Sequence, residues 1–259
     1  MKAEIDGLSV NYIDEGEGKP ILLLHGWGCN GGHWAPVTAG LKENFRVIAP
    51  DIPGFGESQE PKEVWGTKEY ADFFEKFLSK LNIKKPIVAG HSNGGRISII
   101  LGERNLCSRI ILTDSAGIIP KRSMNYYAKI YSYKAMKQVL NLPGLKNKKE
   151  DILEKRRKKS GSADYQAASP MMRKILSKVV NEDLTPNLAH ITVPTLLVWG
   201  SEDTATPLSD GKTMESILKN TGSDAALIVF EGRGHFAFLE ERNRFIKIFE
   251  AFIKPEEVK

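Results

Sequence analysis

Cysteine is scarce in this sequence, and only Cys29 and Cys107 occur among its 259 residues. Two thiols can form at most one bridge, which excludes the disulfide-rich scaffold of a small secreted domain. Their separation matches no spacing of metal-ligand motifs, so the sequence predicts no metal site. We expect both thiols to stay reduced, as in a cytoplasmic protein.

Long hydrophobic runs are also missing. No apolar stretch approaches the roughly 20 residues that cross a bilayer, and the N-terminal segment "MKAEIDGLSVNY" lacks the uninterrupted apolar core of a secretion signal. With 41% hydrophobic and 27% charged residues, the composition is that of a globular protein and excludes disordered and fibrous classes. We therefore expect a cytoplasmic protein with no membrane partner.

The sequence does contain a series of short apolar, β-branched runs with helix-like stretches between them. The runs are "ILLLHG" (21–26), "RVIAPD" (46–51), "PIVAGHS" (86–92), "RIILTDS" (109–115), "PTLLVWG" (194–200) and "ALIVFEG" (226–232). Such runs are typical of parallel strands that helices cover on both faces. Apolar stripes at helical spacing predict a helix over 67–81, with Thr67 as its N-cap, and a last helix over 245–253. Turn signals before residue 20 predict a small antiparallel meander at the sheet edge.

The alternation of strands and helices is interrupted between residues 118 and 187, where no buried-strand run occurs. We interpret 118–187 as a cap of several short helices over the carboxyl edge of the sheet, and residues 1–117 and 188–259 as the core domain. Most of the aromatic and methionine side chains of this cap are expected to form its core, and some are expected to face the sheet. A pocket lined by such side chains favours a substrate with a hydrophobic acyl or aromatic group. These residues are Met124, Tyr126, Tyr127, Tyr131, Tyr133, Met171 and Met172.

The cap segment is strongly basic. Residues 118–180 carry 16 Lys and Arg against 4 Asp and Glu, in a chain whose net charge is +5. We expect the run "KRRKK" (155–159) to face water, with an inward cation that receives an acidic substrate as the alternative. Nucleic acid is not expected as a partner, because the run lacks interleaved aromatics and any known binding motif.

The stretch "VAGHSNGGRIS" (88–98) places Ser92 between Gly90 and Gly94, after an apolar run and before a helix-compatible segment. Ligands of open parallel sheets collect at the carboxyl ends of strands, where this serine falls. A strand that turns abruptly into a helix strains the serine backbone and leaves no room for neighbouring Cβ atoms. This spacing alone does not decide between a nucleophilic and a helix-capping serine; together with a base, an acid and oxyanion donors elsewhere in the sequence, it predicts a nucleophile.

A serine hydroxyl needs a base within hydrogen-bond reach, and that base needs an orienting acid. Among the five histidines, only His235 lies directly after the last apolar run and before the final helix. Asp203 follows the preceding apolar run and completes the order Ser, Asp, His that this architecture requires. Asp114 also ends a strand and is the alternative acid, while Glu202 is a weaker candidate.

The negative oxygen that forms during acyl transfer must meet backbone donors that already point at it. We expect one donor to be the N–H of Asn93, at the start of the helix after the serine. The second is expected to be the N–H of Trp27, where Gly26 lets the backbone approach closely. His25 and His91 flank the site in sequence and are interpreted as structural supports.

Taken together, "LHGWG", "DIPGFGES", "GHSNGG", "WGSEDTATP" and "GRGHF" resemble the α/β-hydrolase superfamily along nearly the whole chain. The resemblance implies an α/β fold with a mostly parallel eight-stranded sheet, an antiparallel second strand, helices on both faces and a helical cap between strands six and seven. It also implies a triad of Ser92, Asp203 and His235. The chain is similar to small bacterial esterases and carbon–carbon bond hydrolases.

We therefore expect a cofactor-independent serine hydrolase that cleaves a carboxylic ester or related acyl compound through an acyl-enzyme, with a small-molecule acyl substrate as its partner. A carbon–carbon bond hydrolase or lyase with the same residues is the alternative, although "GHF" stands where those enzymes often have His followed by Trp. A ligand sensor that keeps the fold and turns over slowly is the alternative from another class.

Overall fold

The computed structural model describes residues 1–119, 124–142, 149, 152–153 and 163–253, so the basic run 155–159 lies outside the described residues. The described chain forms an eight-stranded sheet in the order β1-β2-β4-β3-β5-β6-β7-β8. The strands are β1 (Lys2–Ile5), β2 (Leu8–Glu15), β3 (Lys19–Leu24), β4 (Phe45–Pro50), β5 (Ile87–His91), β6 (Arg109–Thr113), β7 (Thr195–Gly200) and β8 (Ala225–Phe230). Each of the six apolar runs of the sequence overlaps one of these strands, β3 to β8.

Strand direction follows the expected pattern. The pairs β1–β2 and β2–β4 are antiparallel, and the remaining pairs in the sheet are parallel. The central strands are apolar on both sides, and every residue of β5 and β7 is buried. The eight-stranded, mostly parallel sheet with an antiparallel second strand is therefore confirmed.

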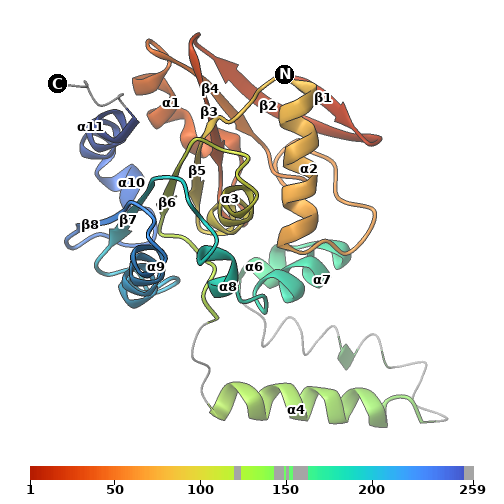
Figure 1. The fold of residues 1–259 in the computed structure, drawn as a ribbon. Helices are drawn as coiled ribbons and strands as arrows, with labels where there is room; N and C mark the ends of the chain where they lie inside the picture. The colour runs from red at the N-terminus through yellow and green to blue at the C-terminus, as the bar shows by residue number, and fades with distance from the viewer. Residues whose placement is uncertain (120–123, 143–148, 150–151, 154–162, 254–259) are drawn as a thin grey trace.

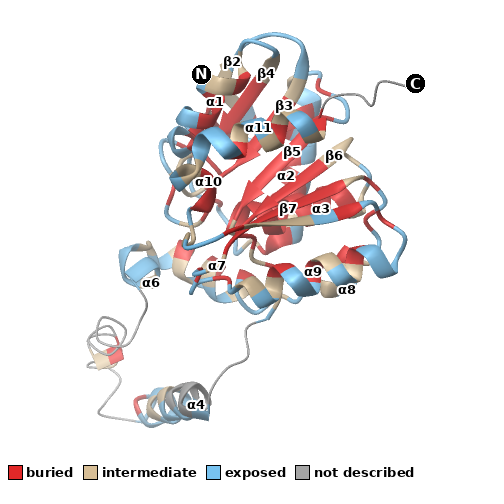
Figure 2. Cartoon of the chain, turned by 90° about the vertical axis from the view of Figure 1, so that its left-hand side faces the viewer, coloured by how far each residue is buried: buried red, intermediate tan, exposed pale blue. Residues whose placement is uncertain are grey.

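Helices cover both faces of the sheet (Figure 1). On one face lie α1 (Ala35–Leu41), which follows the short helix η1 (Gly31–Trp34), together with α10 (Ala237–Glu240) and α11 (Arg242–Ile253). On the other lie α2 (Thr67–Lys80), α3 (Asn93–Glu103), α8 (Thr185–Leu188) and α9 (Leu208–Asn220). Each face has its own hydrophobic core, one including Phe74 and Trp199 and the other including Trp34 and Phe249. Figure 2 shows these buried layers on the two sides of the strands.

The start of α2 differs from the prediction. Thr67 is the first helical residue, and the N-cap is Gly66, which has an extended backbone. Glycine has no side chain to accept from the free amides of the first turn, so carboxylates take that role. Glu69 Oε2 accepts from Gly66 N–H at 2.7 Å, and Glu182 Oε2 accepts from Thr67 N–H at 2.9 Å.

Between β6 and β7, where a cap is predicted, the described residues form α4 (Met124–Val139), α6 (Ala163–Ala167), α7 (Pro170–Val179) and α8. The division of the chain into a core and a cap at 118–187 stays a prediction. Helix α7 packs against the core through buried Met172 and Ile175. Helix α4 lies apart from the sheet (Figures 1 and 2).

The position of α4 corrects one expectation about the apolar side chains of this segment. Met124 is 84% exposed and Tyr131 is 66% exposed, because no described element of the core covers their helix. These two side chains are therefore not part of a cap core. The side chains of Tyr126 and Tyr127 lie outside the described part of the chain. Among the helices that the structure describes, none is both long and apolar enough to cross a bilayer.

Candidate active site

Ser92 lies at the junction of β5 and α3, at the carboxyl edge of the sheet. Its backbone has φ 50° and ψ −111°, a conformation that residues with a Cβ rarely adopt. The turn is held by a hydrogen bond from Ser92 N–H to Thr113 O at 3.2 Å, and Ser92 O accepts from the N–H groups of Gly95 and Ala116. These bonds keep the serine in its strained conformation at the start of the helix.

The glycines around Ser92 are required by close packing. A Cβ on Gly90 would overlap the Ser98 hydroxyl and the carbonyl of Gly94, and a Cβ on Gly94 would overlap the carbonyl of Leu24. Leu24 is the last residue of β3, so the turn after β5 presses directly against the end of the neighbouring strand. Any larger residue at either position would displace backbone atoms.

The loop after β3 lies beside the same turn. A Cβ on Gly26 would come 2.7 Å from His91 Nδ1 and 3.3 Å from Ser92 Cβ. The N–H of Trp27, in this loop, donates to no other group in the described part of the chain. The N–H of Asn93 belongs to the first turn of α3, where amides have no acceptor within the helix. Neither amide has a backbone acceptor among the described residues, and their role as oxyanion donors stays a prediction.

Asp203 and His235 come together from the loops that follow β7 and β8. Asp203 Oδ2 lies 2.7 Å from His235 Nδ1; the Asp203 side chain is fully buried and that of His235 is 22% exposed. Burial raises the pKa of Asp203, but hydrogen bonds from His235 and Thr206 outweigh it and hold that pKa below its ordinary value. With the Nδ1 proton directed at this carboxylate, Nε2 is the ring nitrogen that can accept a proton.

Asp114, the alternative acid, has a different environment. It follows β6, is completely buried and has φ 44°. Its Oδ1 accepts from the N–H of Gly200 at 2.8 Å, and burial raises its pKa to about 8. The geometry thus pairs His235 with Asp203, while the donors to the Asp114 carboxyl are backbone N–H groups and the Thr113 hydroxyl. Glu202 is exposed.

Thr206 belongs to the site, although the sequence analysis does not identify it. Asp203 Oδ1 accepts from the N–H groups of Ala205 and Thr206, at 2.7 and 3.0 Å. The Thr206 hydroxyl donates to Asp203 Oδ2 at 2.7 Å and also lies 3.3 Å from His235 Nδ1. A hydroxyl residue shortly after an aspartate at the end of a strand is the signal that could have indicated this role, because such residues often bond to nearby loop groups.

His25 and His91 both hydrogen-bond to backbone beside the site. His25 Nδ1–H donates to Gly26 O at 2.7 Å, and His25 Nε2 accepts from Ile52 N–H at 2.8 Å. His91 Nε2–H donates to the carbonyl of His235 at 2.7 Å. Burial lowers the pKa of His25 to about 4 and that of His91 to about 3, so both rings are neutral near pH 7. Their contacts fit the supporting role predicted for them.

The two cysteines do not suit a nucleophilic or metal-binding role. Cys29 and Cys107 are both buried and unpaired. Burial raises the pKa of both thiols, to about 12 for Cys107, and a protonated thiol is a poor nucleophile. Within the described ranges, no three His, Cys, Asp or Glu side chains are grouped so that they could hold a metal ion.

A pocket of about 530 Å³ opens beside the loop that carries Trp27. Its walls come from this loop, from the loop that contains Phe55, and from α6 and α7. The rings of Trp27 and Phe55 meet edge to face at 4.8 Å, and Met172 fills the space above Gly54 so tightly that a Cβ there would overlap its sulfur. Arg173 and Asp164 add charge at the α6 and α7 side. The pocket therefore offers aromatic and thioether surface next to an expected oxyanion donor.

Comparison with known proteins finds one matching family and similar sequences and structures. A family model of the alpha/beta hydrolase fold matches residues 19–242. The pimeloyl-[acyl-carrier protein] methyl ester esterase of Legionella pneumophila is 26% identical over 95% of this chain and 100% of its own length. The 2-hydroxy-6-oxo-2,4-heptadienoate hydrolase of Pseudomonas putida is 24% identical over 97% of this chain and 95% of its own. The solved enol-lactonase of Burkholderia xenovorans LB400 shares the fold, with a TM-score of 0.74 and 21% identity over 98% of this chain and 99% of that one.

Proposed function

Because the chain belongs to the α/β-hydrolase family, we propose that it is a serine hydrolase that cleaves a carboxylic ester or a related acyl compound. The observation that carries the proposal is the 2.7 Å contact between Asp203 and His235 at the edge of the sheet where Ser92 occupies its strained turn. An oriented imidazole and a constrained serine at one sheet edge are the parts that nucleophilic acyl transfer needs.

The proposed reaction follows from the positions of these groups. His235 Nε2 takes the proton of the Ser92 hydroxyl as its oxygen attacks the substrate carbonyl, and Asp203 stabilises the imidazolium that forms. The N–H groups of Trp27 and Asn93 bind the negative oxygen of the tetrahedral intermediate. His235 then gives its proton to the leaving alcohol, which produces an acyl-enzyme. Water activated by the same imidazole releases the acid and restores the serine.

The pocket beside Trp27 supports a small to medium-sized substrate with an apolar group. Its volume of about 530 Å³ lies within the usual range for small-molecule sites. Trp27, Phe55 and Met172 supply adaptable apolar surface that favours an acyl chain or an aromatic group. We propose no cofactor, because His235 is the proton donor or acceptor in every proton transfer of the scheme.

Carbon–carbon bond hydrolysis by the same residues is the second candidate. The observation that favours it is the end-to-end likeness to the 2-hydroxy-6-oxo-2,4-heptadienoate hydrolase of Pseudomonas putida. The two candidates separate when purified protein is offered p-nitrophenyl esters of increasing chain length beside a vinylogous 1,5-diketo acid. If the diketo acid is turned over faster than the esters, carbon–carbon bond hydrolysis becomes the better supported function.

The proposed function is tested by labelling with a fluorophosphonate together with ester turnover. We expect the wild-type protein to react stoichiometrically at Ser92 and to turn over short p-nitrophenyl esters many times. Ser92→Ala is expected to abolish both signals while its circular dichroism stays unchanged. The matched control is Ser79→Ala, an exposed serine of α2, which is expected to behave as wild type.

Labelling that persists in Ser92→Ala would remove this serine from the mechanism. Labelling with a single slow turnover would instead favour a ligand sensor on the same fold.

A further inference from the structure

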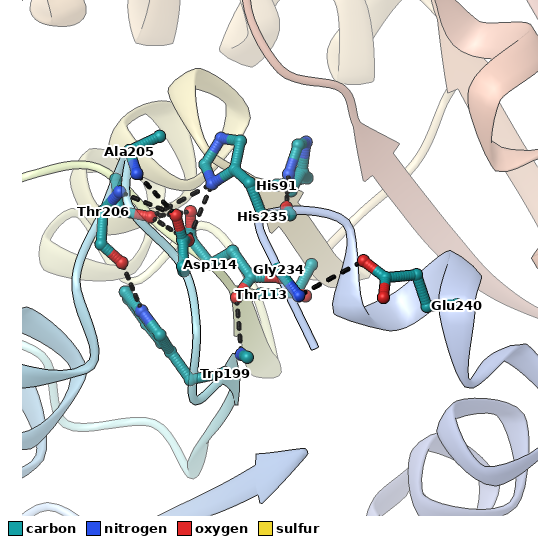
Figure 3. Close-up of polar contacts among 11 residues, drawn as sticks. His91, Thr113, Asp114, Trp199, Ala205, Thr206, Gly234, His235 and Glu240 are labelled. Atoms are coloured by element: carbon teal, nitrogen blue, oxygen red, sulfur yellow. Dashed lines mark hydrogen bonds and ion pairs between the residues drawn. The ribbon is translucent and has the colours of Figure 1, made fainter. Parts of the chain in front are cut away.

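The hydroxyl of Thr206 lies where the ends of three neighbouring strands meet. Its oxygen is 2.7 Å from Asp203 Oδ2 after β7, 2.9 Å from the carbonyl of Asp114 after β6, and 3.3 Å from His235 Nδ1 after β8. Strands β6, β7 and β8 are adjacent in the sheet. A single buried hydroxyl therefore connects the proposed acid, the proposed base and a third strand end (Figure 3).

The backbone of Thr206 holds this hydroxyl in place. Its N–H donates to Asp203 Oδ1 at 3.0 Å, and its carbonyl accepts from the indole N–H of Trp199 at 2.7 Å. Trp199 is fully buried in β7. The N–H and the carbonyl of Thr206 are thus both hydrogen-bonded, and these bonds hold its hydroxyl close to Asp203 and His235.

We propose that Thr206 is a positioning residue of this site, whose hydroxyl holds the Asp203 carboxylate in the orientation that meets His235. The inference rests on the proposed function. A hydroxyl has one proton and two lone pairs. In the resting site the proton goes to Asp203 Oδ2, its nearest acceptor. Because His235 gains its proton at Nε2, Nδ1–H stays directed at Asp203 Oδ2 in both protonation states, and the Thr206 hydrogen bond keeps the carboxylate in that orientation throughout.

The charged groups around Asp203 explain why a neutral donor is useful there. His235 faces the carboxylate from the loop after β8, Asp114 lies after β6, His91 lies in β5, and Asp210 lies in α9. Burial raises the pKa of Asp114 to about 8 and lowers that of His91 to about 3, so neither carries charge near pH 7. Burial and the charge of Asp203 also keep the pKa of Asp210 above its ordinary value. The hydroxyl stabilises the Asp203 charge without adding a cation that would compete with His235.

The test is a comparison of Thr206→Val with Thr206→Ser. Valine keeps the branched shape and removes the hydroxyl, so kcat/KM for a neutral p-nitrophenyl ester and the rate of fluorophosphonate labelling are expected to fall about tenfold. The acidic limb of the kcat/KM profile is expected to move up by as much as about one pH unit. This shift follows because Asp203 loses a hydrogen bond that holds its pKa low, so the coupled Asp203–His235 pair takes up a proton at higher pH. Thr206→Ser is expected to restore the wild-type rate and the wild-type position of the acidic limb. KM is expected to be similar in wild type, Thr206→Val and Thr206→Ser.

Thr195→Val is the matched control, because it removes a buried hydroxyl that donates to Val193 O at 3.0 Å, at the opposite end of β7. It is expected to lower the melting temperature but to keep the wild-type rate and pH profile. If Thr206→Val does not fold, Thr206→Ala takes its place beside Thr206→Ser.

An unchanged acidic limb and rate in the variant without the hydroxyl would overturn the inference. So would a serine variant as slow as the valine or alanine variant, because the methyl group would then be the important part. A wild-type protein that is not labelled at Ser92 would contradict the proposed function, and this inference with it.

Discussion

Asp114 and Asp203 follow neighbouring strands, and both are buried. Asp203 receives hydrogen bonds from two backbone N–H groups, a hydroxyl and an imidazole, and these hold its pKa low. Asp114 receives fewer donors, and burial raises its pKa to about 8. Two aspartates that follow neighbouring strands therefore differ in charge at neutral pH, Asp114 being protonated and Asp203 ionised.

This difference predicts unequal effects of the same substitution at the two aspartates. Asp203→Asn removes the charge that stabilises the imidazolium and favours the wrong tautomer of His235, so kcat is expected to fall by about 10⁴-fold. Asp114→Asn replaces a neutral acid with a neutral amide that can still accept from Gly200 N–H, so its effect on kcat is expected to be far smaller. Steady-state turnover of a neutral ester at pH 7 measures both. A larger loss in Asp114→Asn would show that the acid is assigned to the wrong strand.

At the scale of elements, the end of α7 is tied to the N-terminus of α2. Glu182, just beyond α7, accepts from the N–H and the hydroxyl of Thr67 at 2.9 and 2.5 Å. Lys178 pairs with Glu69 at 2.8 Å, and the buried guanidinium of Arg96 donates to Glu182 O at 3.1 Å. Helix α7, which forms part of the pocket wall, is therefore held to α2 and α3 by charged side chains at its C-terminal end.

Glu182→Ala is expected to lower the free energy of unfolding by about 1–2 kcal/mol, because α2 loses the acceptor for its first amide and a favourable charge near its N-terminus. Denaturant unfolding followed by circular dichroism measures the change. The control is Glu57→Ala, whose carboxylate is 72% exposed and pairs with Lys2 at 3.7 Å, and which is expected to change stability little. Equal stability of the two variants would show that the contact does not hold α7 to the core.

At the scale of the whole molecule, the features that the sequence predicted are those encoded locally. Strand runs, the antiparallel start and the glycines around Ser92 each follow from a few adjacent residues, because burial on both faces or a tight turn restricts the residue types there. The convergence of Asp203 and His235 could be anticipated from chain order, since both follow strands whose carboxyl ends share one edge.

The features that the sequence did not predict depend on partners far apart in the chain. The carboxylate that accepts from the first amide of α2 comes from Glu182, 115 residues beyond Thr67, and the hydroxyl of Thr206 meets the carbonyl of Asp114 92 residues away. The pattern of neighbouring residues in the sequence does not indicate contacts over such distances along the chain. The exposure of Tyr131 on α4 was missed for the same reason, because periodicity reports an apolar face but not whether a neighbouring element covers it.

The buried proton of Asp114 has a consequence for the stability of the whole chain. Burial raises its pKa from 3.8 to about 8, so between these values the folded protein holds a proton that the unfolded chain releases. The stability that Asp114 contributes is therefore fully present below about pH 4 and is lost as the pH rises towards 8. Replacement by asparagine removes this dependence, because the amide does not titrate.

The free energy of unfolding of Asp114→Asn relative to wild type is thus expected to rise between pH 5 and pH 8, with a slope of no more than about 1.4 kcal/mol per pH unit, and to level off above it. Denaturant unfolding of both proteins at several pH values measures the difference. Asp6→Asn, at an exposed pair with Lys76, is the control and is expected to track wild type throughout. A difference between Asp114→Asn and wild type that stays constant with pH would mean that Asp114 is ionised in the folded protein, with its burial offset by the donors around it, Gly200 N–H, Ala237 N–H and the Thr113 hydroxyl.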